Sequence, residues 1–288
     1  MNILVTGSNG QLGSEIKEIS SKYPYNFFFT DINELDITNE ENIRKYVNKK
    51  NIDLIINCAA YTAVDKAEEE KEKADLINHK ALKFLADTAK EREIPLIHIS
   101  TDYVFDGKNY RPYVEDDPVN PQSVYGFTKL KGEEAFKDSG ASGIIIRTSW
   151  VYSSFGHNFV KTMLRLKDRD ELGVVFDQVG TPTYAKDLAK TILEIINNNL
   201  EKIKNKKAEI YHFSNEGVIS WYDFAKAIFE IENISIKVNP IESKDYPTLA
   251  KRPHYSVLNK NKIKNEFNIK IPYWRESLKE CLKRINNG

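Results

Sequence analysis

The sequence predicts an α/β protein: a Rossmann-type doubly wound parallel sheet with a smaller C-terminal α/β lobe. Short apolar runs alternate with longer amphipathic stretches through the first half of the chain, as expected where helices connect parallel strands. A glycine-rich segment follows the first apolar run directly and precedes a helical pattern, as in dinucleotide-binding folds. The 288 residues suffice for one large domain and a small lobe.

Five short apolar runs are rich in β-branched or aromatic residues, which is typical of strands buried on both faces of a parallel sheet. These runs are residues 3–5, 26–29, 54–56, 96–99 and 144–146. Residues 74–92 instead carry apolar side chains at i, i+3 and i+4 spacing, which predicts an amphipathic helix. We also expect helices over residues 14–19 and 185–197, and another buried strand over residues 210–213.

The pattern loosens after residue 150. From about residue 215 the segments are short and mixed, with turns at Asn239-Pro240, Tyr246-Pro247 and Arg252-Pro253. We therefore predict a dinucleotide-binding domain made of residues 1–150 and 182–215. The substrate-binding lobe is expected to comprise residues 151–181 and 216–288.

Composition narrows the class of protein. Lys plus Arg equals Asp plus Glu at 42 each, whereas a protein that binds nucleic acid through its phosphates carries a basic excess. No apolar stretch approaches the ~20 residues that span a bilayer, and the N-terminal apolar run is too short for a signal peptide. Cys58 and Cys281 lack metal-ligand spacing. We expect a cytoplasmic protein with a small-molecule ligand and with neither nucleic-acid nor membrane partners.

Three glycines stand between the first strand and the following helix, at Gly7, Gly10 and Gly13. In this spacing the first glycine permits a tight turn, the second lets the backbone approach a diphosphate, and the third allows close packing of helix on strand. The helix N-terminus then offers free N–H groups and a positive dipole to the anion. The placement of the glycines after a strand predicts a dinucleotide site.

Asp31 follows the second predicted strand. A carboxylate there accepts hydrogen bonds from the 2′-hydroxyl of an adenosine ribose and repels a 2′-phosphate. We therefore expect NADH or NADPH as the cofactor, with NADH favoured. Asp31 also lies in a turn-like segment, which leaves a capping or turn role open. Asp36 and Ile37 are expected near the adenine.

Tyr125 and Lys129 have the Y-x-x-x-K spacing, which places both side chains on one face of a helix. A nearby ammonium lowers the pKa of a phenol from about 10, which would make Tyr125 a usable general acid or base. Thr101 follows the fourth predicted strand, at the edge where open α/β sheets bind ligands. Its hydroxyl could orient a carbonyl oxygen. An ordinary surface helix and a strand-terminal threonine are the structural alternatives.

Several motifs of the chain match one known family. They are Gly7–Gly13, Ala59–Glu68, Ser100–Gly107, Tyr125–Lys129, Arg147–Trp150, Asp177–Pro182 and Arg252-Pro253. Together they resemble the dTDP-4-dehydrorhamnose reductases, which are extended short-chain dehydrogenases/reductases, and the resemblance covers nearly the whole chain. Its most specific part is Ser-Thr-Asp-Tyr-Val-Phe-Asp-Gly at residues 100–107 followed by Tyr-Gly-Phe-Thr-Lys.

The resemblance implies reduction of the C4 ketone of dTDP-4-dehydro-6-deoxy-L-mannose to dTDP-L-rhamnose for surface polysaccharides. Tyr125 would protonate the new alkoxide, Thr101 would hold its oxygen, and Lys129 would bind the nicotinamide ribose while tuning Tyr125. The positions that match cofactor contacts are Gln11, Leu12, Asp31, Ala60, Tyr61 and Thr62.

Three further residues are expected at the substrate. Asp102 and Trp150 match substrate-contacting positions of the family. Arg252 is a candidate for the diphosphate, because a guanidinium pairs bidentately with phosphate oxygens. A structural arginine beside Pro253 is the alternative for Arg252.

Some members of the family bridge a homodimer through Mg²⁺ held by glutamates. Here Glu15 is acidic, and the later position is matched by Asp187. We expect Glu15 and Asp187 to be a surface acidic pair and predict no metal ligands, with Mg²⁺ at a dimer interface as the alternative. A homodimer is the association that the resemblance implies.

Two other functions stay open. Sugar-nucleotide 4-epimerases and 4,6-dehydratases share the glycine segment and the Y-x-x-x-K spacing. A dehydratase typically carries a glutamate directly after its Thr-Asp pair, where this sequence has Tyr103; this argues against dehydration and says less about epimerisation. A noncatalytic, reductase-like regulatory subunit is the other alternative, against which the intact Thr101, Tyr125 and Lys129 argue.

Overall fold

The computed structural model describes residues 1–287 and has a six-stranded parallel sheet at its centre, in the order β10-β5-β4-β3-β1-β2. The strands of this sheet are β1 (Asn2–Thr6), β2 (Asn26–Thr30), β3 (Leu54–Asn57), β4 (Leu96–Thr101), β5 (Gly143–Thr148) and β10 (Glu209–Phe213). Each of them contains its predicted run. The expected doubly wound α/β fold is confirmed.

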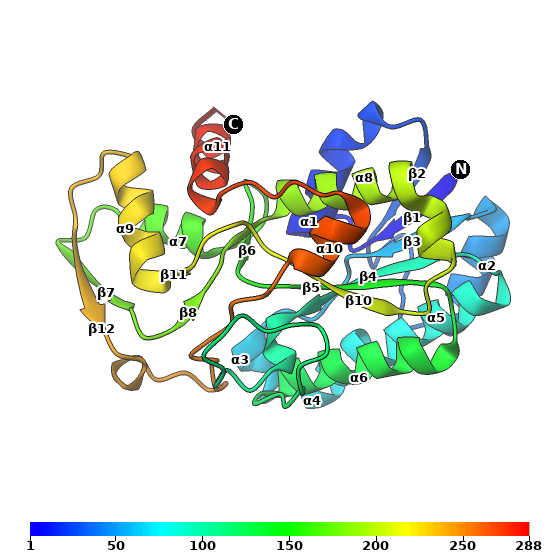
Figure 1. The fold of residues 1–288 in the computed structure, drawn as a ribbon, viewed down its shortest axis with the longest axis horizontal. Coiled ribbons are helices and arrows are strands. Elements are labelled where there is room, and N and C mark those ends of the chain that lie inside the picture. The colour runs from blue at the N-terminus through cyan, green and yellow to red at the C-terminus, as the bar shows by residue number, and fades with distance from the viewer. Residues whose placement is uncertain (288) are drawn as a thin grey trace.

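Helices cover both faces of the sheet (Figure 1). One layer consists of α1 (Gln11–Ile19), α8 (Ala185–Lys204) and α10 (Asn261–Phe267), and the other of α2 (Glu40–Lys50), α5 (Ala81–Glu91) and α6 (Val124–Ser139). In β1, Ile3 and Val5 pack against the first layer and Leu4 against the second, all fully buried. Because successive side chains of a strand point to opposite faces, a strand covered on both sides needs an unbroken apolar run.

Strand β2 differs from the expectation of complete burial. It lies at the edge of the sheet and pairs only with β1. Its three phenylalanines, Phe27, Phe28 and Phe29, are therefore half-buried. An apolar run alone does not reveal which strand is at the edge.

The predicted helix over residues 74–92 is divided. It comprises the end of α4 (Lys71–Asp75), a π-helical turn labelled η2 (Leu76–Lys80), and α5. The wider turn brings the side chain of Asn78 to the inside, where it is buried. Such turns often occur at functional sites, and this one packs against α6.

Strand β1 has β2 on one side and β3 on the other, so the direction of winding reverses there. In open α/β sheets, ligands bind outside the carboxyl ends of the strands at this point. The segments that follow these ends are the glycine loop after β1, the residues that lead to α3 (Val64–Ala67) after β3, and η3 (Asp102–Val104) after β4. Most of the predicted catalytic and cofactor residues lie in or beside these segments or in the first turns of α6. Asp31 lies directly after β2, and Asp36 and Ile37 lie farther along the same loop.

A second body with its own apolar core lies beside the sheet (Figure 1). Its helices are α7 (Phe159–Arg165), α9 (Trp221–Ile231) and α11 (Trp274–Asn287). Its short strands pair as β6 (Val151–Tyr152) with β9 (Thr183–Tyr184), β7 (Glu171–Val175) with β12 (Lys237–Ile241), and β8 (Val179–Gly180) with β11 (Ile219–Ser220). Three single 3-10 turns, η1 (Ser20–Lys22), η3 and η4 (Ser243–Asp245), complete the elements. No helix within residues 1–287 is long and apolar enough to cross a bilayer.

Candidate active site

The glycine loop has the geometry that its spacing predicts. Gly7 has φ +64°, and a Cβ there would lie 2.6 Å from the backbone of Ala59. A Cβ at Gly13 would lie 2.5 Å from the carbonyl oxygen of Gly7. Helix α1 begins at Gln11 without a side-chain cap. Its first N–H groups are therefore free to bind an anion.

Asp31 supports the glycine loop directly. Its Oδ2 accepts a hydrogen bond from the backbone N–H of Asn9 at 3.0 Å, and its Oδ1 accepts one from Ile32 at 2.8 Å. The carboxylate thus lies beside the loop and also serves as a turn residue. Asp36 is engaged locally, since its Oδ1 accepts from the backbone and the hydroxyl of Thr38, and Ile37 is buried.

Asn78 holds the segment after β3, which contains Ala60, Tyr61 and Thr62. Its Oδ1 accepts from the backbone N–H of Tyr61 at 2.8 Å, and its Nδ2 donates to the carbonyl oxygen of Tyr61 and to Thr128 Oγ1, both at 3.1 Å. Sequence reasoning missed Asn78, because only the π-helical turn brings it inside. It links a predicted cofactor segment to the helix that carries Tyr125.

Thr101, Tyr125 and Lys129 meet at the carboxyl end of β4. The Thr101 hydroxyl lies within hydrogen-bonding reach of the Tyr125 phenol, and Lys129 Nζ donates to the carbonyl oxygen of Ile99 at 2.7 Å. Helix α6 can approach the backbone of Tyr103 closely because Gly126 has no side chain. A Cβ there would lie 2.2 Å from the carbonyl oxygen of Tyr103. The i, i+4 pair and the strand-end threonine therefore form one cluster.

In this structure burial, and not Lys129, has the largest effect on the pKa of Tyr125. Burial raises the pKa of Tyr125 above its usual value, and the hydrogen bond with Thr101 opposes this only in part. Lys129 is itself buried and is bound to Ile99 and to His98 Nε2, at 3.0 Å. Desolvation lowers the pKa of Lys129 to about 8, so it contributes less positive charge than an exposed lysine.

Asp102 precedes Tyr103 in the chain, and Arg252 contacts the Tyr103 side chain. Asp102 is buried, and its Oδ1 accepts from Thr101 Oγ1 at 3.0 Å; burial raises the pKa of Asp102 to about 7. Arg252 donates to the Tyr103 hydroxyl at 3.0 Å and pairs with Asp65 at 2.5 Å. The guanidinium is thus held at the site by structural contacts, as the alternative for Arg252 predicted, and its role at the diphosphate stays a prediction.

Trp150 is held in an unusual conformation. Its φ is +48°, which is rare for a bulky residue and is typical of functional sites. Its ring stacks on Trp221 at 3.6 Å between centroids and 11° between planes. A Cβ at Gly180 would lie 2.8 Å from this ring. Trp221, which the sequence analysis missed, forms one wall with Trp150.

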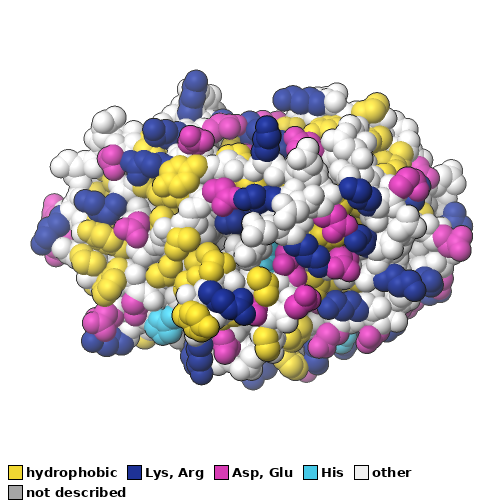
Figure 2. Space-filling view, viewed as in Figure 1, with side chains coloured by type: hydrophobic (Ala, Val, Ile, Leu, Met, Phe, Trp, Pro, Cys, Tyr) yellow, Lys and Arg dark blue, Asp and Glu magenta, His cyan; other side chains and the backbone are white. Residues whose placement is uncertain are grey.

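A cavity of about 720 Å³ opens beside this wall. Tyr103 and Arg252 line it toward the catalytic cluster, and the rest of its lining comes largely from α7, β7 and the loops of the second body. Figure 2 shows hydrophobic side chains gathered over this half of the face, among charges of both signs. Its size and mixed lining suit a small organic ligand with an anionic group.

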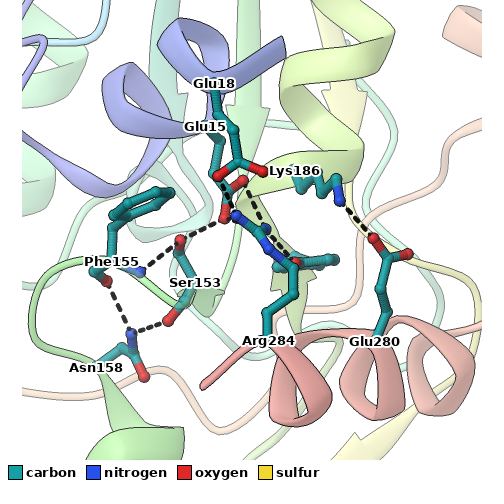
Figure 3. Close-up of polar contacts among 9 residues, drawn as sticks. Glu15, Glu18, Ser153, Phe155, Asn158, Lys186, Glu280 and Arg284 are labelled. Atoms are coloured by element: carbon teal, nitrogen blue, oxygen red, sulfur yellow. Dashed lines mark hydrogen bonds and ion pairs between the residues drawn. The ribbon is translucent and has the colours of Figure 1, made fainter. Parts of the chain in front are cut away.

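Glu15 and Asp187 are not a surface acidic pair, and this expectation is corrected. Glu15 is fully buried, and its carboxylate accepts from Ser153 Oγ at 2.6 Å and from Arg284 Nη1 at 2.9 Å (Figure 3). Asp187 is also buried and binds Asn215 and Ser277 instead. A guanidinium on α11 thus neutralises Glu15, so the residues at this position do not fit a divalent cation.

A doubly wound sheet, a glycine loop at its switch point and a Thr–Tyr–Lys cluster beside a ligand-sized cavity define a short-chain dehydrogenase/reductase-like oxidoreductase. A family model described as the RmlD substrate binding domain matches residues 1–287. The chain is 43% identical to a dTDP-4-dehydrorhamnose reductase of Aggregatibacter actinomycetemcomitans, over 96% of this chain and 97% of that protein. The chain belongs to the dTDP-4-dehydrorhamnose reductase family.

Solved structures agree with this assignment. A dTDP-4-dehydrorhamnose reductase of Clostridium acetobutylicum has a TM-score of 0.94 and 44% identity, covering 99% of this chain and all of that one. The Bacillus anthracis enzyme, solved with NADP, has a TM-score of 0.92 and 38% identity, covering 98% and 99%. A dTDP-glucose 4,6-dehydratase of Bacillus anthracis shares only the fold, with a TM-score of 0.83 at 17% identity.

Proposed function

We propose that this protein reduces the C4 ketone of dTDP-4-dehydro-6-deoxy-L-mannose to dTDP-L-rhamnose with NADH or NADPH. The meeting of Thr101, Tyr125 and Lys129 at the carboxyl end of β4 carries the proposal. It is supported by the full-length match to reductases of this name. The product would serve the synthesis of rhamnose-containing polysaccharides.

In the proposed reaction the nicotinamide supplies hydride to C4 of the sugar when the cofactor is bound. The Thr101 hydroxyl holds the ketone oxygen, and Tyr125 donates a proton to that oxygen as negative charge develops on it. The raised pKa of Tyr125 keeps the phenol protonated, which suits a donor in the direction of reduction. Lys129 lies beside this pair and binds the nicotinamide ribose.

The second body, which contains α7, α9 and α11, is proposed to bind the nucleotide part of the substrate, and the sheet with its two helix layers the cofactor. Helix α10, expected in the substrate lobe, packs on the sheet instead, and β9 belongs to the second body. Arg252 lines the cavity and is proposed to contact the diphosphate. Asp102, which is buried beside Tyr103, is proposed to contact the sugar. The Trp150–Trp221 stack offers a flat aromatic wall. Flat apolar surfaces of this kind suit a sugar or a pyrimidine ring.

We propose a preference for NADH over NADPH, because the Asp31 carboxylate lies beside the glycine loop and would repel a 2′-phosphate. The relative from Bacillus anthracis was solved with NADP. The cofactor segments are proposed to be residues 7–13, Asp31 with Asp36 and Ile37, and residues 60–62.

The proposal is tested by following the absorbance of NADH during incubation with dTDP-4-dehydro-6-deoxy-L-mannose, with the UDP and GDP analogues in parallel. Stoichiometric oxidation and a dTDP-L-rhamnose product are expected. A 4-epimerase or a dehydratase would convert its substrate while its cofactor returned unchanged. Product formed without net NADH consumption would therefore overturn the assignment.

A further inference from the structure

A continuous row of buried polar groups runs beneath the candidate active site, from β1 to α6. Lys129 Nζ lies 3.0 Å from His98 Nε2, and His98 Nδ1 lies 3.1 Å from Asn57 Nδ2. Asn57 Oδ1 accepts from the backbone N–H of Ala59 at 3.1 Å and from Thr6 Oγ1 at 2.6 Å. Asn57, His98 and Lys129 are each at most 2% exposed. These groups must therefore satisfy one another.

The two ends of this row fix the direction of its hydrogen bonds. A backbone N–H such as that of Ala59 only donates, so the atom of Asn57 that it meets is the oxygen, and the amide nitrogen of Asn57 must donate to His98 Nδ1. A neutral imidazole has one N–H, which then sits on Nε2 and points at Lys129 Nζ. A nitrogen that accepts this proton has a lone pair. The arrangement is thus that of an uncharged lysine amine, which donates to Ile99.

The surroundings of Lys129 also bear on its charge. Glu133, one turn along α6, is committed to Arg147 on β5 at 2.6 Å and to Ser100 on β4 at 2.5 Å. No carboxylate within residues 1–287 forms an ion pair with Lys129. The charge of Glu133 raises the pKa of Lys129, but burial has the larger effect and lowers that pKa overall. Tyr125 on α6 and Asp102 on η3 are the other titratable groups nearby, and burial raises the pKa of both. Burial lowers the pKa of His98 well below its usual value, which keeps the ring neutral.

We propose that, in the free protein at alkaline pH, the Nε2–H of His98 donates a hydrogen bond to an uncharged Lys129 amine, and that binding of the nicotinamide dinucleotide makes Lys129 an ammonium, which takes up one proton from solvent and turns from His98 to the ribose hydroxyls. The second half rests on the proposed function. Ribose hydroxyls offer oxygen acceptors to the ammonium, and the diphosphate adds negative charge, so the bound cofactor favours the protonated form. His98 is in this view a positioning residue that acts through Lys129.

The free protein tests the first half without any cofactor. We would label histidine with ¹⁵N and record the ring nitrogen shifts at pH 8.5, with the His98→Gln variant to assign the His98 signals. His98 is expected to be neutral with its proton on Nε2. A proton on Nδ1, or a charged ring, would overturn the proposal whatever the enzyme reduces.

Titration calorimetry of NADH binding, in buffers of different ionisation enthalpy, tests the second half. We expect uptake of more than half a proton at pH 8.5 and much less at pH 6.5, because the pKa of Lys129 in the free protein is about 8. Lys129→Met should abolish the uptake. His98→Gln, which offers Lys129 an oxygen acceptor, should reduce it by at least half, whereas His79→Gln on η2 should leave it unchanged.

NADH binding without proton uptake at pH 8.5 would overturn the second half, as would full uptake in Lys129→Met. If NADH bound with the expected uptake but no keto-sugar were reduced, the proposed substrate would be wrong and the proton exchange would stand.

Discussion

Tyr125 is half-buried and interacts with Thr101, and desolvation of its phenol raises the pKa and keeps the group protonated. Tyr125→Phe removes the proton donor and preserves the ring, so turnover should fall by about 10²–10⁴-fold, while the Kd for NADH changes by less than a few-fold. Single-turnover kinetics and calorimetry would measure the two quantities. Tyr110→Phe, at a highly exposed tyrosine, is the matched control, and normal turnover in Tyr125→Phe would remove the assigned role.

Asp31 has two tasks, since it supports the backbone of Asn9 and is proposed to face the adenosine ribose. Asp31→Asn keeps an oxygen acceptor for the loop and removes the negative charge. The ratio of kcat/KM for NADH to that for NADPH should therefore fall, because a 2′-phosphate is no longer repelled. An unchanged ratio would show that another group reads the ribose.

Asp102 makes stability depend on pH. Its pKa is raised from 3.8 to about 7 by burial, so the folded state holds a proton that the unfolded chain loses above pH 4. Protonated Asp102 therefore contributes on the order of 4 kcal/mol to the free energy of unfolding below pH 4, relative to its ionised form. This contribution is lost as the pH rises through 7.

Asp102→Asn lacks this titration. The stability of the variant relative to the wild type should therefore improve steadily between pH 4 and pH 7, as measured by urea unfolding at each pH. Other carboxyl groups contribute equally to both proteins and cancel in the difference. A difference that did not change with pH would contradict the raised pKa.

At the scale of elements, the π-helical turn η2 joins the segment after β3 to α6. Asn78 makes three buried hydrogen bonds, to both backbone groups of Tyr61 and to Thr128. Helix α6 can lie this close only because Gly132 has no side chain, since a Cβ there would lie 2.2 Å from the carbonyl oxygen of Asn78.

Asn78→Ala should destabilise the protein by about 1–3 kcal/mol, because it leaves buried backbone groups of Tyr61 without partners. It should also weaken NADH binding, since residues 60–62 lose their support. Chemical denaturation and calorimetry would measure these effects beside Asn48→Ala, which removes an exposed asparagine of α2. Equal stability of the two variants would show that the π-helical turn is not held by Asn78.

At the scale of the whole molecule, Arg284 joins the C-terminal helix to the dinucleotide-binding helix (Figure 3). It contacts Glu15 and Glu18 on α1 and the Tyr184 hydroxyl. Burial alone raises the pKa of Glu15 and lowers that of Arg284, and their contact opposes both effects. An internal cation thus compensates a fully buried carboxylate.

Arg284→Met should destabilise the protein by about 3–5 kcal/mol, because it leaves Glu15 buried and unpaired. Arg284→Met combined with Glu15→Gln should recover much of this loss. The Tm of the wild type should be the same in EDTA and in MgCl₂, since the guanidinium already neutralises Glu15. A clear rise of the wild-type Tm with MgCl₂ would contradict this account.

The sequence alone determined the sheet, its strands and the residues of the cofactor loop, because these depend on local chemistry. Unbroken apolar runs predict buried parallel strands, and glycine spacing predicts a tight turn before a helix. The same holds for the Tyr125–Lys129 pair, since residues i and i+4 of a helix share a face. The identity of the sugar was implied by the family resemblance and not by the spacing of residues.

Only the tertiary structure decided what depends on neighbours distant in sequence. β2 is half-buried because it lies at the edge of the sheet. Glu15 is buried against Arg284, which lies 269 residues away in the chain. Trp221 lines the cavity because it stacks on Trp150. The hydrogen bonds of Lys129 likewise reach His98 and, through it, Asn57, which come from two other strands. The charge of a group depends on its burial and on its hydrogen-bond partners. Both of these depend on how separate segments of the chain pack together.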